Sequence, residues 1–381
     1  MGQKDRMTPF NKPFIVGKEL YNIAQAVLKG HLAGDGHYTK LCHAWLEEKL
    51  GCKKALLTHS CTAALEMCAI LCNIQPGDEV ILPSFTFVST ANAFVLRGGV
   101  PVFVDIRHDT LNIDESKIEE AITVKTKVIV PVHYAGVPCA MDEILNISDK
   151  HNLYVVEDAA QALLSTYKSR YLGTIGHFGC LSFHETKNII SGEGGALLIN
   201  NEQFIKRAEI IREKGTDRPQ FFRGEIDKYS WVDIGSSYLP SELVSAFLYA
   251  QMEHAENIIT KRRKLFDLYY SSLKQLEEEG LIRLPFINRE CVSNGHIFYI
   301  ITNTLDERAR LIDHLKKNEV FAVFHYVPLH SSHAGMRYGR VSGNMITTDD
   351  ISNRLLRLPI YYDMTDDDVK QVVRLINIFY S

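Results

Sequence analysis

The chain lacks the features of a membrane-spanning, secreted or fibrous protein. Among its 381 residues there is no uninterrupted run of eighteen apolar residues, and the first residues are polar. Neither a membrane span nor a secretory leader is therefore expected. With only 12 prolines against 46% hydrophobic residues, the composition excludes collagen and a disordered chain. We expect a globular protein of the cytoplasm.

An excess of charge and a metal-binding pattern are missing too. The 42 Lys and Arg against 46 Asp and Glu leave a net charge of -4, so nucleic acid and anionic membranes are not expected as partners. None of the eight cysteines forms a CxxC pair, which favours free thiols. His330 and His333 have a metal-like spacing but no partnering Cys or His pair, so no metal is expected.

What the chain does contain is a regular alternation of short β-rich runs and helical patterns from about residue 50. This pattern predicts an α/β fold with a mostly parallel sheet. Residues 241–276 read as one long helix, and we place a domain boundary within it. Residues 1–255 then form a large domain and residues 256–381 a smaller α/β domain. Residues 215–238 interrupt the alternation as a long loop, and such loops are usually functional.

Two charged residues that follow predicted strands point to a cofactor. Asp158 ends an apolar run, where the carboxyl edge of an open sheet binds ligands, although it could equally cap the next helix. Lys187 lies in a polar turn closed by the glycine-rich residues 192–195, and alone it would be interpreted as solvated. Pyridoxal phosphate (PLP) needs a lysine amine that bonds to it and an acid that keeps its pyridine nitrogen protonated. Lys187 and Asp158 suit these two roles.

The same cofactor needs a phosphate site and an aromatic face. Residues 58–64 (THSCTAA) place small hydroxyl residues between a predicted strand and a helix, where a helix N-terminus can bind phosphate. An ordinary N-cap is the alternative. Residues 83–89 (PSFTFVS) supply two phenylalanines that could stack on a ring or belong to the core.

Residues 157–161 (EDAAQ) and 182–195 (SFHETKNIISGEGG) together resemble the sugar-nucleotide aminotransferases of the DegT/DnrJ/StrS type, and the similarity runs over about residues 11–362. The resemblance implies the fold-type I PLP aminotransferase fold, with a large domain around a central mostly parallel sheet and a smaller C-terminal α/β domain. It implies that Lys187 bonds to the cofactor and carries the proton, while Asp158 pairs with the pyridine nitrogen. The further cofactor-binding residues that it implies are Gln161 near the ring, Thr62, Ala63 and Ser182 at the phosphate, and Phe87 on the ring.

Within the family, five stretches resemble the branch of dTDP-4-amino-4,6-dideoxygalactose transaminases: residues 10–13, 34–40, 220–224, 231–240 and 325–330. By this resemblance an amino acid, glutamate by family likeness, donates its amino group to C4 of dTDP-4-keto-6-deoxy-D-glucose. The product is dTDP-4-amino-4,6-dideoxy-D-galactose. A 3-keto or UDP-linked sugar is an alternative acceptor.

The acceptor's diphosphate requires cationic side chains. Arg218 and Arg223 in the long loop and Lys12 are candidates, although each could also be a solvated charge. His325 and Tyr326 could meet sugar hydroxyls or simply pack.

Family likeness also implies a homodimer with shared active sites. Many relatives place an Asn, in the segment matching residues 236–239, at the partner's cofactor phosphate. This chain has none there, which leaves Ser236, Ser237 or Tyr238 for that contact.

Three other functions are less well supported by the residues. Relatives that dehydrate sugars carry His where this chain has Lys187. An NAD-linked oxidoreductase would need GxGxxG after a strand, and Gly34-Asp35-Gly36 lacks the third glycine. A non-enzymatic, ligand-binding regulator would not need the pair of Lys187 and Asp158.

Overall fold

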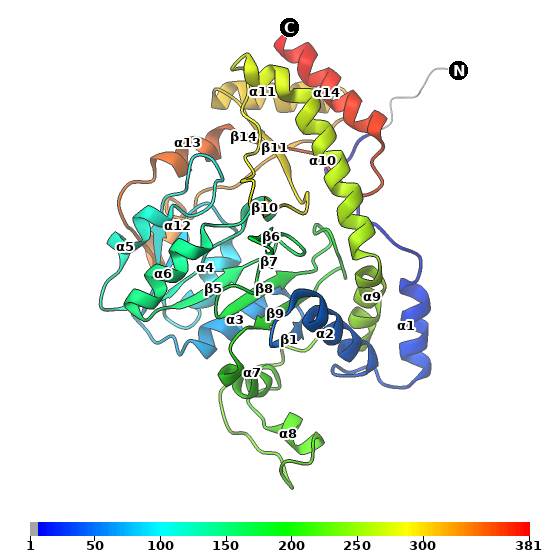
Figure 1. Cartoon of the computed structure of the whole chain (residues 1–381), viewed down its shortest axis with the longest axis vertical. Helices are drawn as coiled ribbons and strands as arrows, with labels where there is room; N and C mark the ends of the chain where they lie inside the picture. Colours follow the sequence, from blue (N-terminus) through cyan, green and yellow to red (C-terminus); the bar gives the residue numbers. More distant parts are fainter. Residues whose placement is uncertain (1–6) are drawn as a thin grey trace.

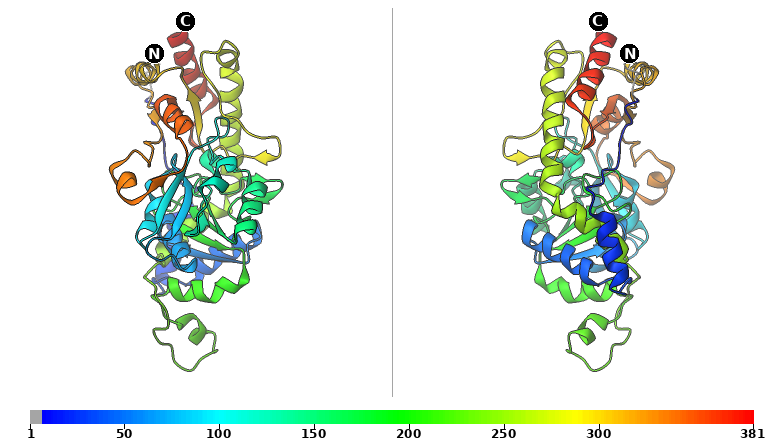
Figure 2. Two further views of the ribbon diagram at one scale, coloured as in Figure 1. Left: turned by 90° about the vertical axis from the view of Figure 1, so that its left-hand side faces the viewer. Right: turned by 90° about the vertical axis from the view of Figure 1, so that its right-hand side faces the viewer.

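The computed structural model describes residues 7–381 and shows a body around one large sheet with a smaller part beside it (Figure 1). The first six residues, on which the expectation of no leader partly rests, lie outside the described residues. Helix α10 (Ala255–Glu278) runs along one side and connects the two parts. The segment that contains α8 (Arg218–Phe222) projects from the end of the large part that faces away from the smaller part, as the side views also show (Figure 2).

Within the described residues 7–381, the large sheet has eight strands and is parallel except at one strand. Its order is β1 (Lys54–Thr58), β9 (Gly195–Ile199), β8 (Phe178–Ser182), β5 (Tyr154–Asp158), β4 (Thr126–Ile129), β2 (Glu79–Pro83), β3 (Val100–Val104) and β13 (Arg340–Val341). Only β9 runs antiparallel to its neighbours β1 and β8. The predicted α/β fold with a mostly parallel sheet is therefore confirmed.

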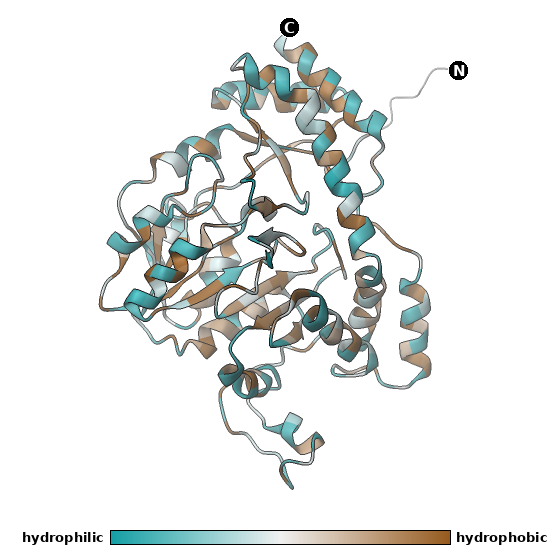
Figure 3. Ribbon diagram, viewed as in Figure 1, coloured by the Kyte–Doolittle hydropathy of each residue, from teal (hydrophilic) through white to brown (hydrophobic). Residues whose placement is uncertain are grey.

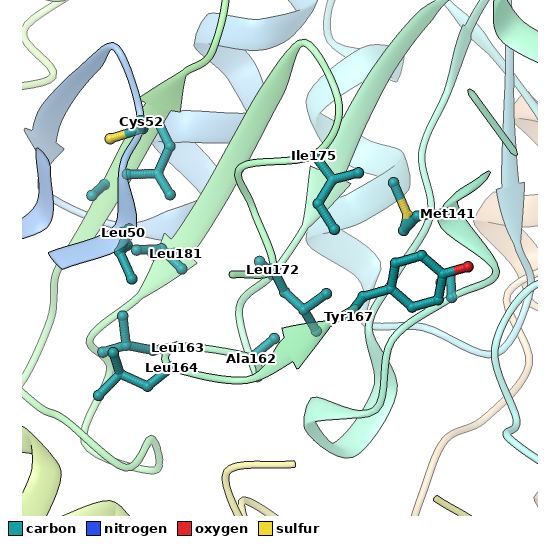
Figure 4. Close-up of a cluster of buried hydrophobic side chains, with 14 of the residues drawn as sticks. Leu50, Cys52, Met141, Ala162, Leu163, Leu164, Tyr167, Leu172, Ile175 and Leu181 are labelled. Atoms are coloured by element: carbon teal, nitrogen blue, oxygen red, sulfur yellow. The ribbon is translucent and has the colours of Figure 1, made fainter. Parts of the chain in front are cut away.

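Helices cover both faces of this sheet, because successive strand residues point to opposite sides. In β1, Leu57 packs into the cluster that includes α2 (His37–Leu50) and α6 (Met141–His151), part of which Figure 4 shows. Leu56 packs instead into the cluster that includes α3 (Cys61–Leu71), α4 (Val88–Val95) and α7 (Ile205–Arg212). Two buried layers thus hold the strand ends in place.

The predicted single helix over residues 241–276 is wrong. Helix α9 (Glu242–Glu253) ends before His254, which has φ -108° and ψ 7°, and α10 begins directly after it. The break redirects the chain between two cores. Ile258 of α10 still packs in the core of the large sheet, whereas Leu265 and Leu273 belong to the core of the smaller part.

The smaller part is an antiparallel sheet with helices packed on it. Strand β14 (Leu355–Leu358) pairs with β11 (Phe298–Ile301) and β12 (Val323–Phe324). Helices α10, α11 (Leu305–Lys317) and α14 (Asp366–Tyr380) lie around it. Figure 3 shows apolar residues gathered in the strands and striped along these helices. No helix within residues 7–381 is long and apolar enough to cross a membrane.

The remaining α-helices and strands are α1 (Glu19–Leu28), α5 (Ile118–Ala121), β6 (Thr166–Tyr167), β7 (Arg170–Tyr171), β10 (Cys291–Val292), α12 (His333–Tyr338) and α13 (Ile346–Arg354). Several contacts tie the two parts together, among them the pairing of β10 with β6. Thr8 exchanges backbone hydrogen bonds with Glu319 and Phe321 of the smaller part. Conversely, β13 joins the large sheet. The domain boundary at residue 255 stays a prediction, because segments on each side of that residue also pack in the other part.

Candidate active site

A cavity of about 620 Å³ lies where the carboxyl ends of the sheet strands face the smaller part. This edge is where open α/β sheets bind ligands. The predicted site residues that line the cavity are Thr62, Phe87, Asp158, Gln161, Ser182, Lys187, His325 and Tyr326. The fold therefore gathers most of the residues selected from the sequence, although they are spread over more than half of the chain.

Asp158 is the last residue of β5 and points its carboxylate at the cavity from a buried position. Thr90 Oγ1 donates to its Oδ2 at 2.7 Å, and the Ala160 N–H donates to its Oδ1 at 3.2 Å. Its backbone N–H donates to the Pro131 carbonyl at 2.9 Å. These bonds hold the carboxylate in one orientation, ready to pair with a protonated ring nitrogen.

Lys187 lies in the loop between β8 and β9. Its N–H donates to the His184 carbonyl, and the Glu185 N–H donates to the Gly192 carbonyl at 2.8 Å, which closes the turn. Gly192 has φ +80°, a conformation that favours glycine. Within residues 7–381, no hydrogen bond or ion pair reaches the Lys187 ammonium. Burial lowers its pKa, which favours the neutral amine that can act as nucleophile and base.

The N-terminus of α3 opens into the same cavity. Ser60 is its N-cap residue and accepts from the Ala63 N–H at 3.1 Å, while Thr62 Oγ1 donates to Ser89 Oγ at 2.8 Å. Gly195 passes so close that a Cβ there would lie 2.3 Å from the Ser60 carbonyl carbon. Ser182 pairs with Gly195 across β8 and β9. Hydroxyls around a helix N-terminus make an anion site; Ala63 itself does not line the cavity.

An aromatic face and an amide complete the cofactor side of the cavity. Phe87 precedes α4 and is 57% exposed, although it is large and apolar. An open aromatic face of this kind suits stacking on a planar ring. Gln161 accepts from the Ala135 N–H at 2.7 Å and donates to the Tyr326 hydroxyl at 2.9 Å. This amide therefore connects the end of β5 to the smaller part.

His325 and Tyr326 line the opposite side. The Tyr134 hydroxyl, which the sequence did not indicate, lies 3.0 Å from His325 Nδ1. Burial lowers the pKa of His325 and raises the pKa of Tyr326. Both groups are therefore neutral near pH 7 and can form hydrogen bonds to a polar substrate.

These groups fit pyridoxal phosphate by their chemistry. The cavity holds a half-buried, unpaired amine on Lys187, a fixed carboxylate on Asp158, hydroxyls at a helix N-terminus and an open ring on Phe87. Each matches one part of the cofactor: the aldehyde, the pyridine nitrogen, the phosphate and the ring face.

The predicted cationic substrate residues do not line the cavity of their own chain. Lys12 pairs with Asp363 at 2.5 Å. Arg218 pairs with Glu213 at 3.2 Å and Arg223 with Glu209 at 2.9 Å, both at the projecting α8 (Figure 1). Their role in substrate binding stays a prediction.

Among the cavity residues that the sequence did not single out are Arg262, His296 and Arg357 of the smaller part. Arg262 donates to the Gly295 carbonyl at 3.3 Å and to the His296 carbonyl at 2.7 Å, and burial lowers its pKa to about 9. The side chain of His296 lies 2.9 Å from Asn188 Oδ1. No motif distinguishes these residues, because they come from separate elements of the smaller part.

Comparison with known proteins places this arrangement among aminotransferases. The model of the DegT/DnrJ/EryC1/StrS aminotransferase family matches residues 15–377. The uncharacterized protein MJ1066 of Methanocaldococcus jannaschii is 36% identical over 96% of this chain and 97% of its own. The spore coat polysaccharide biosynthesis protein SpsC of Bacillus subtilis is 31% identical (98% and 97%). GDP-perosamine synthase of Escherichia coli O157:H7 is 29% identical (98% and 98%).

Solved structures agree over nearly the whole chain. The aminotransferase TlmJ from Streptoalloteichus hindustanus superposes with a TM-score of 0.89 at 26% identity, covering 98% of this chain and 99% of TlmJ. Spr1654 from Streptococcus pneumoniae in its PLP form superposes with a TM-score of 0.90 at 25% identity, covering 98% of each chain. The similarity therefore includes a structure that was solved with this cofactor.

Proposed function

The chain belongs to the DegT/DnrJ/EryC1/StrS aminotransferase family, and from that premise we propose which sugar it aminates. It is a PLP-dependent aminotransferase that acts on a nucleotide-linked sugar. The proposed acceptor is dTDP-4-keto-6-deoxy-D-glucose, aminated at C4 by L-glutamate to give dTDP-4-amino-4,6-dideoxy-D-galactose. Transfer at this cavity is supported above all by the unpaired amine of Lys187 and the carboxylate of Asp158, which line it together.

The proposed catalytic groups divide the work. When bound, PLP supplies an aldehyde that takes up the amino group and a ring that delocalises the electron pair freed at the donor carbon. Asp158 holds the proton of the ring nitrogen. Lys187 Nζ would take the proton from the donor Cα and deliver it again, and the burial that lowers the pKa of Lys187 favours the neutral amine that this requires.

Both substrates would use this one cavity in turn. L-glutamate gives up its amino group and leaves as 2-oxoglutarate, after which the keto sugar receives the same group at C4. Such a sequence gives ping-pong kinetics. Ser60, Thr62 and Ser182 would hold the cofactor phosphate throughout, while His325 and Tyr326 would bind the sugar hydroxyls.

The proposed active form is a homodimer. In the projecting segment Phe222 is 69% and Trp231 81% exposed, so the segment leaves large apolar groups for a partner to cover. Arg218 and Arg223 would then bind the diphosphate in the partner's cavity. Ser236 and Ser237 are exposed, whereas Tyr238 is buried in its own chain, so the two serines are better suited to the partner's cofactor phosphate.

A GDP-linked keto sugar is the second candidate acceptor. It is favoured by the match to GDP-perosamine synthase, which is 29% identical over 98% of both chains. The dTDP-linked acceptor is supported instead by the five sequence stretches that resemble the dTDP-sugar branch.

The decisive experiment incubates the holoenzyme with L-glutamate and, in parallel, with dTDP-, UDP- and GDP-linked 4-keto-6-deoxy sugars. NMR of the product locates the new amine and its configuration at C4. We expect a galacto-configured 4-amino sugar on dTDP. An amine at C3, or turnover of only the UDP- or GDP-linked sugar, would contradict the proposal.

A further inference from the structure

Arg357 is a cation in the cavity without a counter-ion. It lies on β14, lines the cavity and is half-buried. Its Nε has no hydrogen-bond partner, and within residues 7–381 no carboxylate forms an ion pair with its guanidinium. Its Cζ lies 4.7 Å from the centre of the Phe10 ring. A desolvated charge of this kind is costly unless a ligand compensates it.

Arg262 shows what a structural arginine looks like in the same place. It also lines the cavity, but its Nε and one terminal nitrogen donate to the carbonyls of Gly295 and His296. Through these bonds Arg262 holds the backbone of the segment before β11 in place. Within residues 7–381, Arg357 has no such bonds: its Nε is buried without a partner, and no protein group binds its two terminal nitrogens.

The surroundings of Arg357 determine which part of a substrate can reach it. Burial is the main cause that lowers the pKa of Lys187 and of His325, and the charge of Arg357 lowers both further. Arg357 and Lys187 line the same cavity. Neither acid of the cavity neutralises it: Asp158 is held by Thr90, and Glu193 lies exposed near His184.

We propose that Arg357 binds the α-carboxylate of the amino-acid donor, an inference that rests on the aminotransferase function proposed above. The α-carboxylate is one bond from the carbon that Lys187 deprotonates, so its receptor must lie near Lys187. The sugar's diphosphate is attached at C1, across the ring from C4, and cannot be as close to the reacting carbon. A guanidinium is the natural receptor for a planar carboxylate.

The test separates the two half-reactions of the holoenzyme. In Arg357→Gln, the KM for L-glutamate, followed by the cofactor absorbance, should rise about 10- to 100-fold, the loss expected for a charged hydrogen bond. The KM for 4-aminobutyrate, which lacks the α-carboxylate, should stay nearly unchanged. Amination of the keto sugar by enzyme already loaded with the amino group should also be unaffected. Arg357→Lys should recover part of the glutamate affinity.

Arg354→Gln is the matched control, since Arg354 pairs with Asp350 outside the cavity. It should keep the wild-type KM for L-glutamate. The thermal unfolding temperature of Arg357→Gln should equal or exceed that of the wild type, because the change removes an unpaired buried charge. A lower unfolding temperature with unchanged donor selectivity would assign Arg357 a structural role and overturn the inference.

Two other outcomes are equally informative. If Arg357→Gln binds dTDP more weakly and L-glutamate normally, the guanidinium serves the nucleotide and the inference is wrong. If the wild type rejects every keto sugar tested, while Arg357→Gln still loses L-glutamate selectively, the proposed acceptor is wrong and the role of Arg357 stands.

Discussion

The carboxyl edge of the large sheet and the projecting segment of residues 215–238 are built in opposite ways. At the edge, hydrogen-bond donors of the same chain satisfy the buried carboxylates. Glu157, for example, accepts from the N–H groups of Gly173, Ile175 and Gly176. In the projecting segment, Trp231 is 81% exposed, and Arg218 pairs with nearby Glu213. The edge can form a site within one chain, whereas the segment has apolar surface that only a partner would cover.

The largest effect should come from the amine at the edge. Lys187→Ala should lower kcat at least about 10³-fold and abolish the absorbance of the lysine-bound cofactor, because within residues 7–381 no other lysine lines the cavity. Lys168→Ala, at an exposed lysine bound to Asp142, is the control and should keep both. An active, yellow Lys187→Ala protein would refute the assignment.

The projecting segment should respond through assembly instead. Trp231→Glu should raise the dissociation constant of the proposed dimer about 100-fold, the loss expected for an aromatic residue that a partner covers at the centre of an interface. Sedimentation equilibrium at several concentrations measures this. Val124→Glu alters an apolar residue that is 99% exposed and should leave assembly unchanged. If the Trp231 variant and the wild type dimerised equally well, the apolar surface of the projecting segment would not be covered by a partner at Trp231.

Asp105 lies directly after β3 at the same edge of the sheet. Its substitution tests how much stability the protein gains from buried carboxylates that accept several hydrogen bonds. Burial alone would raise its pKa, but hydrogen bonds from Thr348, Ile106 and Thr347 outweigh burial and lower it. A lowered folded-state pKa contributes stability above the unfolded value of about 4, which is lost as the pH falls through the folded value. Asp105→Asn should therefore cost about 2 kcal/mol at pH 7. It should also make unfolding less acid-sensitive below about pH 4.

Urea titrations at pH 7 and in acid measure both effects. Asp306→Asn, at an exposed helical acid bound to Arg310, should change neither. If the free energy of unfolding of Asp105→Asn fell in acid as steeply as that of the wild type, the ionised Asp105 carboxylate would not stabilise the fold.

The smallest effect is expected for the charges of the projecting segment. Arg218→Gln should raise the KM for the nucleotide sugar by about 10-fold through loss of a charge-assisted contact. The half-reaction with L-glutamate should stay as in the wild type. Arg310→Gln, on the exposed face of α11, is the control. A changed donor step, or an unchanged sugar KM, would place Arg218 outside the sugar site.

Local patterns in the sequence were enough to predict much of the fold and the cofactor side of the cavity. Strand-ending Asp158, the turn around Lys187 and the hydroxyls before α3 all depend on neighbours within a few residues. The antiparallel direction of β9 could not be predicted, because a short apolar run has the same pattern in either direction. Nor could the break at His254, since both flanking helices continue an amphipathic pattern while packing on different cores.

The sequence by itself predicted the chemistry, because the motifs around Asp158 and Lys187 resemble those of one family of PLP-dependent aminotransferases. Only the tertiary structure decided which cations face the cavity. Arg262 and Arg357 are the same residue type, yet α10 brings one against backbone carbonyls and β14 leaves the other without a partner. The partners of a guanidinium come from segments distant in the chain, so packing, and not local pattern, sets its role.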